Sequence, residues 1–215
     1  MADLERARVN LLRHLDHEIA DKRVIEAMKR VRREGFVSAE QYRAAYDDRP
    51  LGIGFGQTIS QPFIVALMVQ ALELRGDEEV LELGTGSGYE AAILAELAEK
   101  VVTVEYIPEL AKSAKQVLDK LGYSNIEVHV AGKTLGWPEG APYDAIIVSA
   151  GAPTVPQALL EQLSYGGGLV IPVGSRWQQE LFKVTKLRKG NKVENLGGCY
   201  FVPLIGEGAW EGQKR

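Results

Sequence analysis

The sequence is poor in cysteine, with Cys199 alone among 215 residues. A lone cysteine excludes a disulfide framework within the chain and is typical of proteins from a reducing compartment. Histidine is scarce too, and the spacing of His14, His17 and His129 neither completes a metal site nor pairs a base with the cysteine. We therefore expect neither a thiol nucleophile nor a bound metal.

Long apolar runs are also absent. No stretch approaches the roughly 20 apolar residues of a membrane-spanning helix, and residues 1–13 lack the apolar core of a secretory signal. The formal net charge of −4 argues against nucleic acid as a partner, because a nucleic-acid backbone needs a basic surface. The sequence therefore predicts a cytoplasmic protein that binds neither a membrane nor nucleic acid.

Two regions of different periodicity make up the chain. Residues 1–75 carry apolar side chains at helical spacing, interrupted by a glycine-rich loop over residues 51–57. Residues 76–215 alternate short apolar strands with helices, which is the pattern of a mostly parallel, doubly wound sheet. The last two strands, near 181–187 and 193–202, flank a turn and predict an antiparallel hairpin. We expect an α/β fold whose N-terminal helical extension packs on the same domain.

A glycine turn follows the first strand of the second region, in the run Glu82-Leu83-Gly84-Thr85-Gly86-Ser87-Gly88. Glycines let the backbone turn sharply and approach a ligand closely. The G-x-G-x-G spacing differs from the dinucleotide fingerprint and resembles the first motif of Rossmann-like class I methyltransferases. Glu105 ends the next strand, where an acidic side chain can accept hydrogen bonds from two ribose hydroxyls. A plain βα turn with a solvated glutamate is the alternative, and the joint spacing disfavours it.

A more specific resemblance covers nearly the whole chain. The loop Leu-Gly-Ile-Gly-Phe-Gly-Gln-Thr-Ile-Ser-Gln-Pro over residues 51–62 resembles the substrate loop of the protein-L-isoaspartate O-methyltransferases. Other segments resemble the same family, namely residues 45–50, 141–146, 150–153, 171–174 and 201–204. The block from Gln57 to Pro62 is far more specific than the glycine turn.

The resemblance implies a protein repair enzyme of the cytoplasm. Its methyl donor would be S-adenosylmethionine, converted to S-adenosylhomocysteine without a metal, and residues 76–215 would be the domain that binds it. The acceptor would be the free carboxylate of L-isoaspartyl and D-aspartyl residues in damaged proteins and peptides. The methyl ester then closes to a succinimide, whose hydrolysis returns some normal aspartate. We expect the enzyme to act as a monomer.

The resemblance also assigns roles to residues. The serine that matches Ser60 belongs to the active site, so we expect Ser60 to be catalytic. A carboxylate is already an anionic nucleophile, so a hydroxyl that holds one oxygen is needed rather than a general base. The alternative role for Ser60, capping the helix that begins at Gln61-Pro62, can coexist with this one. Substrate contacts are expected at Thr58, Ser60 and Val202. Cofactor contacts are expected at Gln57, Thr58, Ile59, Glu82, Gly84, Thr85, Gly86, Gly88, Glu105 and Gly132.

One position departs from the family pattern. The family carries Gly-Asp-Gly after its fourth strand, with the Asp reaching the adenine amino group, whereas this chain has Ala131-Gly132-Lys133. The adenine contact is therefore missing, and a charge-assisted hydrogen bond is worth about 1.5–3 kcal/mol. Two other functions stay open: a relative that methylates an aspartate of one dedicated peptide, and a cofactor-binding homologue without activity.

Overall fold

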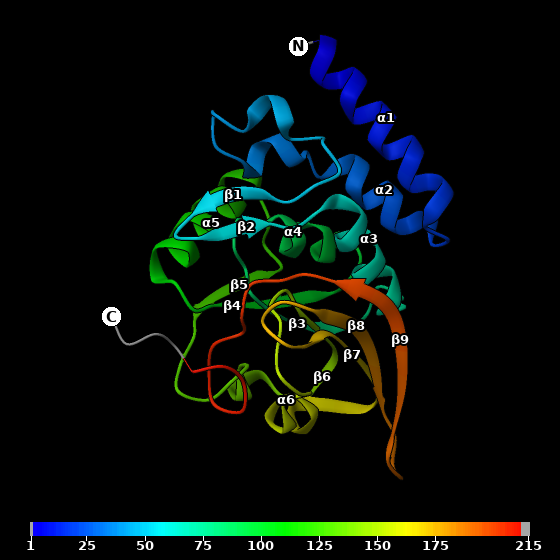
Figure 1. Ribbon diagram of the computed structural model, residues 1–215, viewed down its shortest axis with the longest axis vertical. Coiled ribbons are helices and arrows are strands. Elements are labelled where there is room, and N and C mark those ends of the chain that lie inside the picture. Colours follow the sequence, from blue (N-terminus) through cyan, green and yellow to red (C-terminus); the bar gives the residue numbers. More distant parts are fainter. Residues whose placement is uncertain (1, 212–215) are drawn as a thin grey trace.

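The computed structural model describes residues 2–211, with helices packed on both faces of a central sheet (Figure 1). The helices are α1 (Ala2–Glu18), α2 (Lys22–Arg30), α3 (Pro62–Ala71), α4 (Tyr89–Ala95), α5 (Pro108–Leu121) and α6 (Gln157–Gln162). The strands are β1 (Leu51–Gly54), β2 (Gln57–Ile59), β3 (Glu79–Leu83), β4 (Lys100–Glu105), β5 (Ile126–Val130), β6 (Tyr143–Val148), β7 (Leu163–Gly174), β8 (Gln179–Lys186) and β9 (Asn191–Cys199). Short 3-10 turns lie at Arg33–Phe36, Tyr42–Ala44 and Pro138–Gly140.

The main sheet has seven strands in the order β5-β4-β3-β6-β7-β8-β9. Strands β3 to β7 run parallel, and β8 and β9 return antiparallel. This arrangement confirms the expected doubly wound sheet with a C-terminal hairpin. The strand order reverses between β3 and β6, and ligands of such sheets bind at the carboxyl ends of the strands at that reversal.

Alternating side chains of the central strands supply two cores, one on each face of the sheet. Val80, Val101 and Ala145 pack with residues of α1 to α5, while their sequence neighbours Leu81, Val102 and Ile146 pack with α6 and the C-terminal segment. Figure 1 shows α6 on the opposite side of the sheet from α2 and α3. Because both faces are covered, these strands read as continuous apolar runs. The division predicted at residue 75 stays a prediction, although side chains from both sides of it share one core.

The glycine-rich loop expected over residues 51–57 is an antiparallel hairpin of β1 and β2. Its turn is formed by Phe55 and Gly56, with φ of 53° and 72°. A two-residue turn with positive φ at both positions matches the twist of the flanking strands. The sequence hid this turn because its first position carries phenylalanine, instead of the asparagine, aspartate or glycine that usually mark it.

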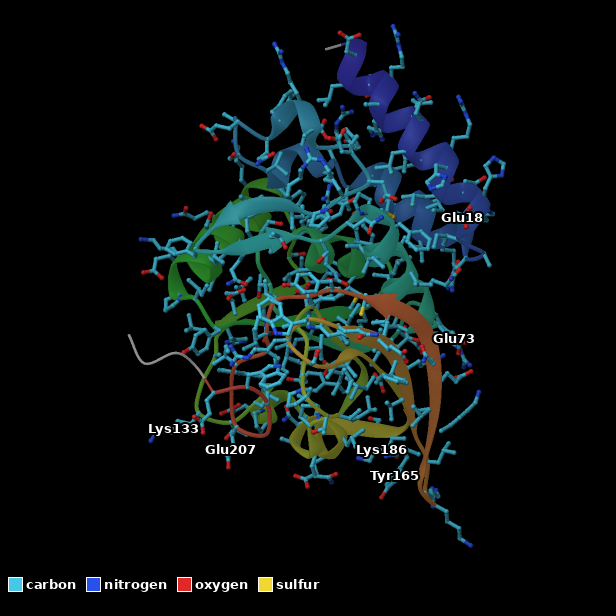
Figure 2. All side chains as sticks on the ribbon, in the orientation of Figure 1. Glu18, Glu73, Lys133, Tyr165, Lys186 and Glu207 are labelled. Atoms are coloured by element: carbon cyan, nitrogen blue, oxygen red, sulfur yellow. The ribbon has the colours of Figure 1, made fainter. Side chains whose placement is uncertain are left out.

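Strand β7 is longer than the expected 169–173, because it begins at Leu163 and contains a bulge. The pairing with β6 moves from Tyr143↔Leu163 to Ala145↔Gly168, so the intervening residues of β7 bulge out. The exposed Tyr165 belongs to this bulge, and Lys186 Nζ of β8 lies 5.0 Å from its ring centre. Figure 2 labels both residues at the lower part of the molecule.

No helix among residues 2–211 has the length and apolar character needed to cross a membrane. In the same part of the chain, no cluster of histidine, cysteine and acidic side chains is suited to hold a metal ion.

We predict that Gly167→Ala destabilises the fold by about 1–3 kcal/mol, the usual cost of overpacking. A Cβ at this position would lie 2.6 Å from the carbonyl oxygen of Asp144, which belongs to the backbone of β6 and cannot swing away. The matched control is Gly168→Ala, whose Cβ would meet only Lys183 Cε at 3.8 Å. Urea unfolding of both variants measures the difference, and equal midpoints would contradict the steric argument.

Candidate active site

The glycine turn joins β3 to α4 at the point where the strand order reverses. Gly84, Gly86 and Gly88 have φ of 98°, 52° and 86°, in the region that side chains other than glycine rarely adopt. A Cβ on Gly84 would lie 3.4 Å from Ser149 Cβ, and one on Gly86 would lie 3.3 Å from Ile53 Cδ1. The turn is therefore enclosed by the end of β6 on one side and by the β1–β2 hairpin on the other.

Glu105, at the end of β4, is buried and holds the turn through its carboxylate. Its Oε2 accepts a hydrogen bond from Gly86 N at 2.9 Å, and its Oε1 accepts one from Ile107 N at 2.9 Å. A carboxylate oxygen accepts more than one hydrogen bond. Glu105 therefore retains acceptor capacity toward the adjoining cavity while its orientation is fixed by the backbone.

A cavity of about 140 Å³ opens at these strand ends. Predicted site residues in its wall are Gln57, Thr58, Gly84, Gly86, Glu105, Gly132 and Val202. The residues that sequence reasoning missed include Tyr106, Ile107, Leu135, Ser149, Ala150 and Pro203–Gly206. Tyr106 and Ile107 directly follow Glu105, so their position next to a predicted site residue could have placed them in the wall of the cavity.

A smaller pocket of about 30 Å³ adjoins this cavity. Its wall contains the predicted residues Thr58, Ile59, Ser60, Gly84, Thr85 and Gly86, together with Glu90 and Ser149. Thr58, Gly84, Gly86 and Ser149 border both spaces. The two spaces therefore meet at the glycine turn, with Ser60 on the side of the smaller one.

Ser60 does not cap α3. The N-cap position belongs to Gln61, and within residues 2–211 this helix has no side-chain cap hydrogen bond. Asp48 instead anchors the start of the helix, because its Oδ1 accepts from Phe63 N at 2.9 Å and its Oδ2 from Gln61 Nε2 at 3.0 Å. The hydroxyl of Ser60 is therefore not used for capping.

The structure does not bring Glu82 and Gly88 to the wall of either space. Glu82 is fully buried beneath the turn, where its Oε2 accepts a hydrogen bond from Thr103 Oγ1, which in turn contacts Thr85 Oγ1. A Cβ on Gly88 would lie 3.2 Å from Leu118 Cδ1 of α5. Both residues support the glycine turn from below. They can contribute to ligand binding only by holding the backbone of that turn in place.

Glu90 is the largest departure from the expected site. It belongs to the first turn of α4 and lies buried beside the smaller pocket, where Ser149 Oγ donates a hydrogen bond to its Oε2. Burial raises the pKa of Glu90 to about 7. Burial, followed by the charge of Glu90, also raises the pKa of Glu82 well above its usual value. An acidic residue inside an otherwise apolar helical segment was the signal in the sequence.

The residues of the larger cavity suit an adenosyl ligand. A fixed carboxylate at Glu105 suits two ribose hydroxyls, and the side chains of Ile107 and Leu135 offer apolar surface to a flat ring. Gly132 leaves open space, because a Cβ built on it would meet nothing within 4 Å. Lys133 does not fill that space, since Figure 2 shows it directed outward at the edge of the molecule.

Known proteins resemble the chain closely. The model of the family described as protein-L-isoaspartate(D-aspartate) O-methyltransferase matches residues 6–209. The protein-L-isoaspartate O-methyltransferase 1 of Syntrophobacter fumaroxidans is 58% identical over 194 residues, which cover 90% of this chain and 91% of that protein.

Solved structures are similar over nearly the whole fold. One protein-L-isoaspartate O-methyltransferase has a TM-score of 0.83 at 28% identity and covers 94% of this chain and 67% of its own. A putative protein-L-isoaspartate O-methyltransferase from Plasmodium falciparum, in complex with S-adenosyl-L-homocysteine, has a TM-score of 0.75 at 25% identity. It covers 90% of this chain and 95% of its own.

We predict that Glu90→Gln makes the protein relatively more stable as the pH rises. Because burial raises the folded-state pKa from 4.5 to about 7, the wild type loses free energy of unfolding as the pH rises through that interval. The glutamine variant has no such loss, so it should gain on the order of 1–3 kcal/mol over the wild type between about pH 4.5 and about pH 8.

Urea unfolding at the two pH values measures this gain. The control is Glu161→Gln, which removes a carboxylate from the exposed surface of α6. If Glu90→Gln and the wild type kept the same difference in stability at both pH values, the raised pKa would be wrong.

Proposed function

Because this chain belongs to the protein-L-isoaspartate(D-aspartate) O-methyltransferase family, we propose that Ser60 is the residue that holds the acceptor carboxylate during its reaction. The chain is a repair enzyme that moves a methyl group from S-adenosylmethionine to the free carboxylate of L-isoaspartyl and D-aspartyl residues in damaged proteins. The observation that carries the proposal for Ser60 is its position in the small pocket that joins the larger cavity at the glycine turn.

The larger cavity is the proposed cofactor site, with Glu105 accepting from the ribose hydroxyls and Gly84 and Gly86 backing the methionine portion. When bound, S-adenosylmethionine supplies an electrophilic methyl group on a positively charged sulfur. Thr58 borders both spaces, while Gln57 lines the larger cavity and Ile59 the smaller pocket. Glu82, Thr85 and Gly88 keep the turn in shape, and Gly132 faces the adenine end of the cavity.

The proposed role of Ser60 follows from the chemistry of the acceptor. A carboxylate is ionised at neutral pH and attacks without a general base. The residues around it then have to hold one oxygen, direct the other along the line of transfer and exclude water. The hydroxyls of Ser60 and Thr58 supply hydrogen-bond donors for the first oxygen, and Val202 is the proposed apolar contact to the peptide.

The names of the curated relatives support the repair reaction over a dedicated peptide substrate or an inactive homologue. Isoaspartyl proteins and peptides are accordingly the partners of this enzyme. We further propose that it works as a monomer in the cytoplasm and does not bind nucleic acid. The single cysteine supports the cytoplasmic location, and the net charge of −4 supports the absence of nucleic-acid binding.

The assay that tests this function uses two peptides that differ only in an isoaspartyl or an aspartyl residue. We expect methylation of the isoaspartyl peptide alone, measured as S-adenosylhomocysteine formed. Ser60→Ala should lower kcat/KM by about tenfold to a hundredfold, the usual worth of a hydrogen bond to a charged group.

Ser113→Ala, on the exposed surface of α5, is the matched control and should keep the wild-type rate. Activity on the aspartyl peptide would overturn the repair function. Full activity of Ser60→Ala would remove the role proposed for that hydroxyl while leaving the reaction itself intact.

The departure at Gly132 predicts weaker binding of S-adenosylmethionine than in relatives that carry aspartate. Gly132→Asp should bind the cofactor about tenfold more tightly, since a hydrogen bond to a charged group contributes about 1.5–3 kcal/mol. Space for the added side chain exists at this wall of the cavity. Calorimetric titration measures the affinity, with Gly132→Ala as the control that adds a Cβ without a carboxylate. Equal affinity of the wild type and both variants would contradict the prediction.

A further inference from the structure

The smaller pocket, which contains Ser60, is the proposed site of the acceptor carboxylate and is called the acceptor pocket below. A pair of buried carboxyl groups lies beneath it, and the reaction described above does not use them. The carboxyl group of Glu82 lies under the glycine turn, and Glu90 lies beside it at the start of α4. One oxygen of each group has a partner, Thr103 Oγ1 for Glu82 and Ser149 Oγ for Glu90. The other oxygen of each, Oε1, is buried without a hydrogen-bond partner.

The surroundings of this pair lack a compensating positive charge. Among residues 2–211, those that line the acceptor pocket include no lysine, arginine or histidine. From β4, Glu105 adds a further negative charge that acts on Glu82. The basic group on the other side of α4 is Arg33, which stacks on the ring of Tyr89 at 5.0 Å and donates its Nε to Ala45 O.

Two buried carboxylates without a cation cannot both stay ionised at neutral pH, because desolvation and mutual repulsion favour protonation of at least one of them. Burial raises the pKa of both groups, that of Glu90 to about 7. Glu90 is the member that borders the acceptor pocket. Its protonation state therefore decides whether a negative charge faces the anionic acceptor.

Ser149 connects Glu90 to the reacting groups. Its hydroxyl contacts Glu90, and the residue lines both the cofactor cavity and the acceptor pocket at their junction. A hydroxyl has one proton to donate and lone pairs to accept with. If Ser149 donates to an ionised Glu90, only its lone pairs remain for the acceptor. If a protonated Glu90 donates to Ser149 Oγ, the proton of Ser149 is free to point into the pocket.

We propose that Glu90 is a positioning residue, which in its protonated form donates to Ser149 Oγ so that the Ser149 hydroxyl donates to the acceptor carboxylate. Ionisation of Glu90 releases its proton to solvent, reverses the hydrogen bond with Ser149 and places a negative charge behind the acceptor. The isoaspartyl residue then binds more weakly. This inference rests on the proposed acceptor pocket at Ser60, to which it adds a second donor and a dependence on pH.

The sign of the pH dependence follows from the two ionisations. The acceptor is a carboxylate with an ordinary pKa of about 3–4, so it stays ionised throughout the neutral range. Glu90 titrates within that range, and only its neutral form favours the acceptor. Affinity for the isoaspartyl peptide should therefore fall as the pH rises past neutrality, while methyl transfer from the bound complex changes little.

The test compares pH profiles of KM and kcat in the wild type and Glu90→Gln, at saturating S-adenosylmethionine. The peptide is acetylated and free of histidine, so nothing in it titrates between about pH 6 and about pH 8. The readout is S-adenosylhomocysteine, which does not depend on the stability of the ester. We expect the wild-type KM to rise about tenfold over this interval, with kcat changing less than about twofold.

Glutamine keeps the shape of Glu90 and carries a permanent donor for Ser149 Oγ. In Glu90→Gln the KM should therefore stay near its low-pH value at every pH. Glu161→Gln on the exposed surface of α6 is the control and should keep the wild-type profile. A variant profile that rises as in the wild type would overturn the proposal. If the wild type did not methylate the isoaspartyl peptide at any pH, the result would instead contradict the repair function itself.

A second measurement uses the wild type alone, so it does not depend on the folding of a variant. Enzyme loaded with S-adenosylhomocysteine is titrated with the isoaspartyl peptide in buffers of different ionisation enthalpy. Binding should take up close to one proton at about pH 8 and almost none at about pH 6, because the bound state requires neutral Glu90. Binding without proton uptake at about pH 8 would overturn the proposal.

Discussion

The carboxylate of Glu105 holds together the strand ends on which the site depends. Its two oxygens accept from Gly86 N in the turn after β3 and from Ile107 N after β4. The turn itself exists only because Gly84, Gly86 and Gly88 tolerate positive φ. One side chain thus fixes the backbone of the turn, and the same group is the proposed acceptor for the ribose hydroxyls of the cofactor.

The position of the loop over residues 51–62, which contains Ser60, follows from that turn. Ile53 of the β1–β2 hairpin packs against the turn, since its Cδ1 lies 3.3 Å from where a Cβ on Gly86 would be. Thr58 of the same hairpin borders both the larger cavity and the smaller pocket. Asp48 anchors the start of α3 directly after the hairpin. The loop is therefore held at both ends, which suits a reaction whose main requirement is the alignment of two groups rather than proton transfer.

The site also contains more negative charge than binding of a carboxylate acceptor favours. Glu82, Glu90 and Glu105 come from consecutive elements around one turn. Glu105 has two backbone amides as partners, whereas Glu82 and Glu90 each leave one buried oxygen without a partner. Protonation resolves this conflict for the buried pair, since a neutral carboxyl costs far less to bury than an ion. The same protonation makes the pair responsive to pH.

The class of fold, the glycine turn with Glu105 and the loop that contains Ser60 could all be predicted from the amino-acid sequence. These features depend on local spacing, namely the alternation of strands and helices and short runs of specific residues, which one chain displays directly. Tertiary packing was needed to show that Ser149, directly after β6, meets Glu90 of α4, 59 positions away, and that Glu82 lies beneath the turn rather than in the cavity. It also decided that the glycine-rich segment is a hairpin. Contacts between distant segments depend on how the helices and the sheet pack, and neither periodicity nor composition records which side chains that packing brings together.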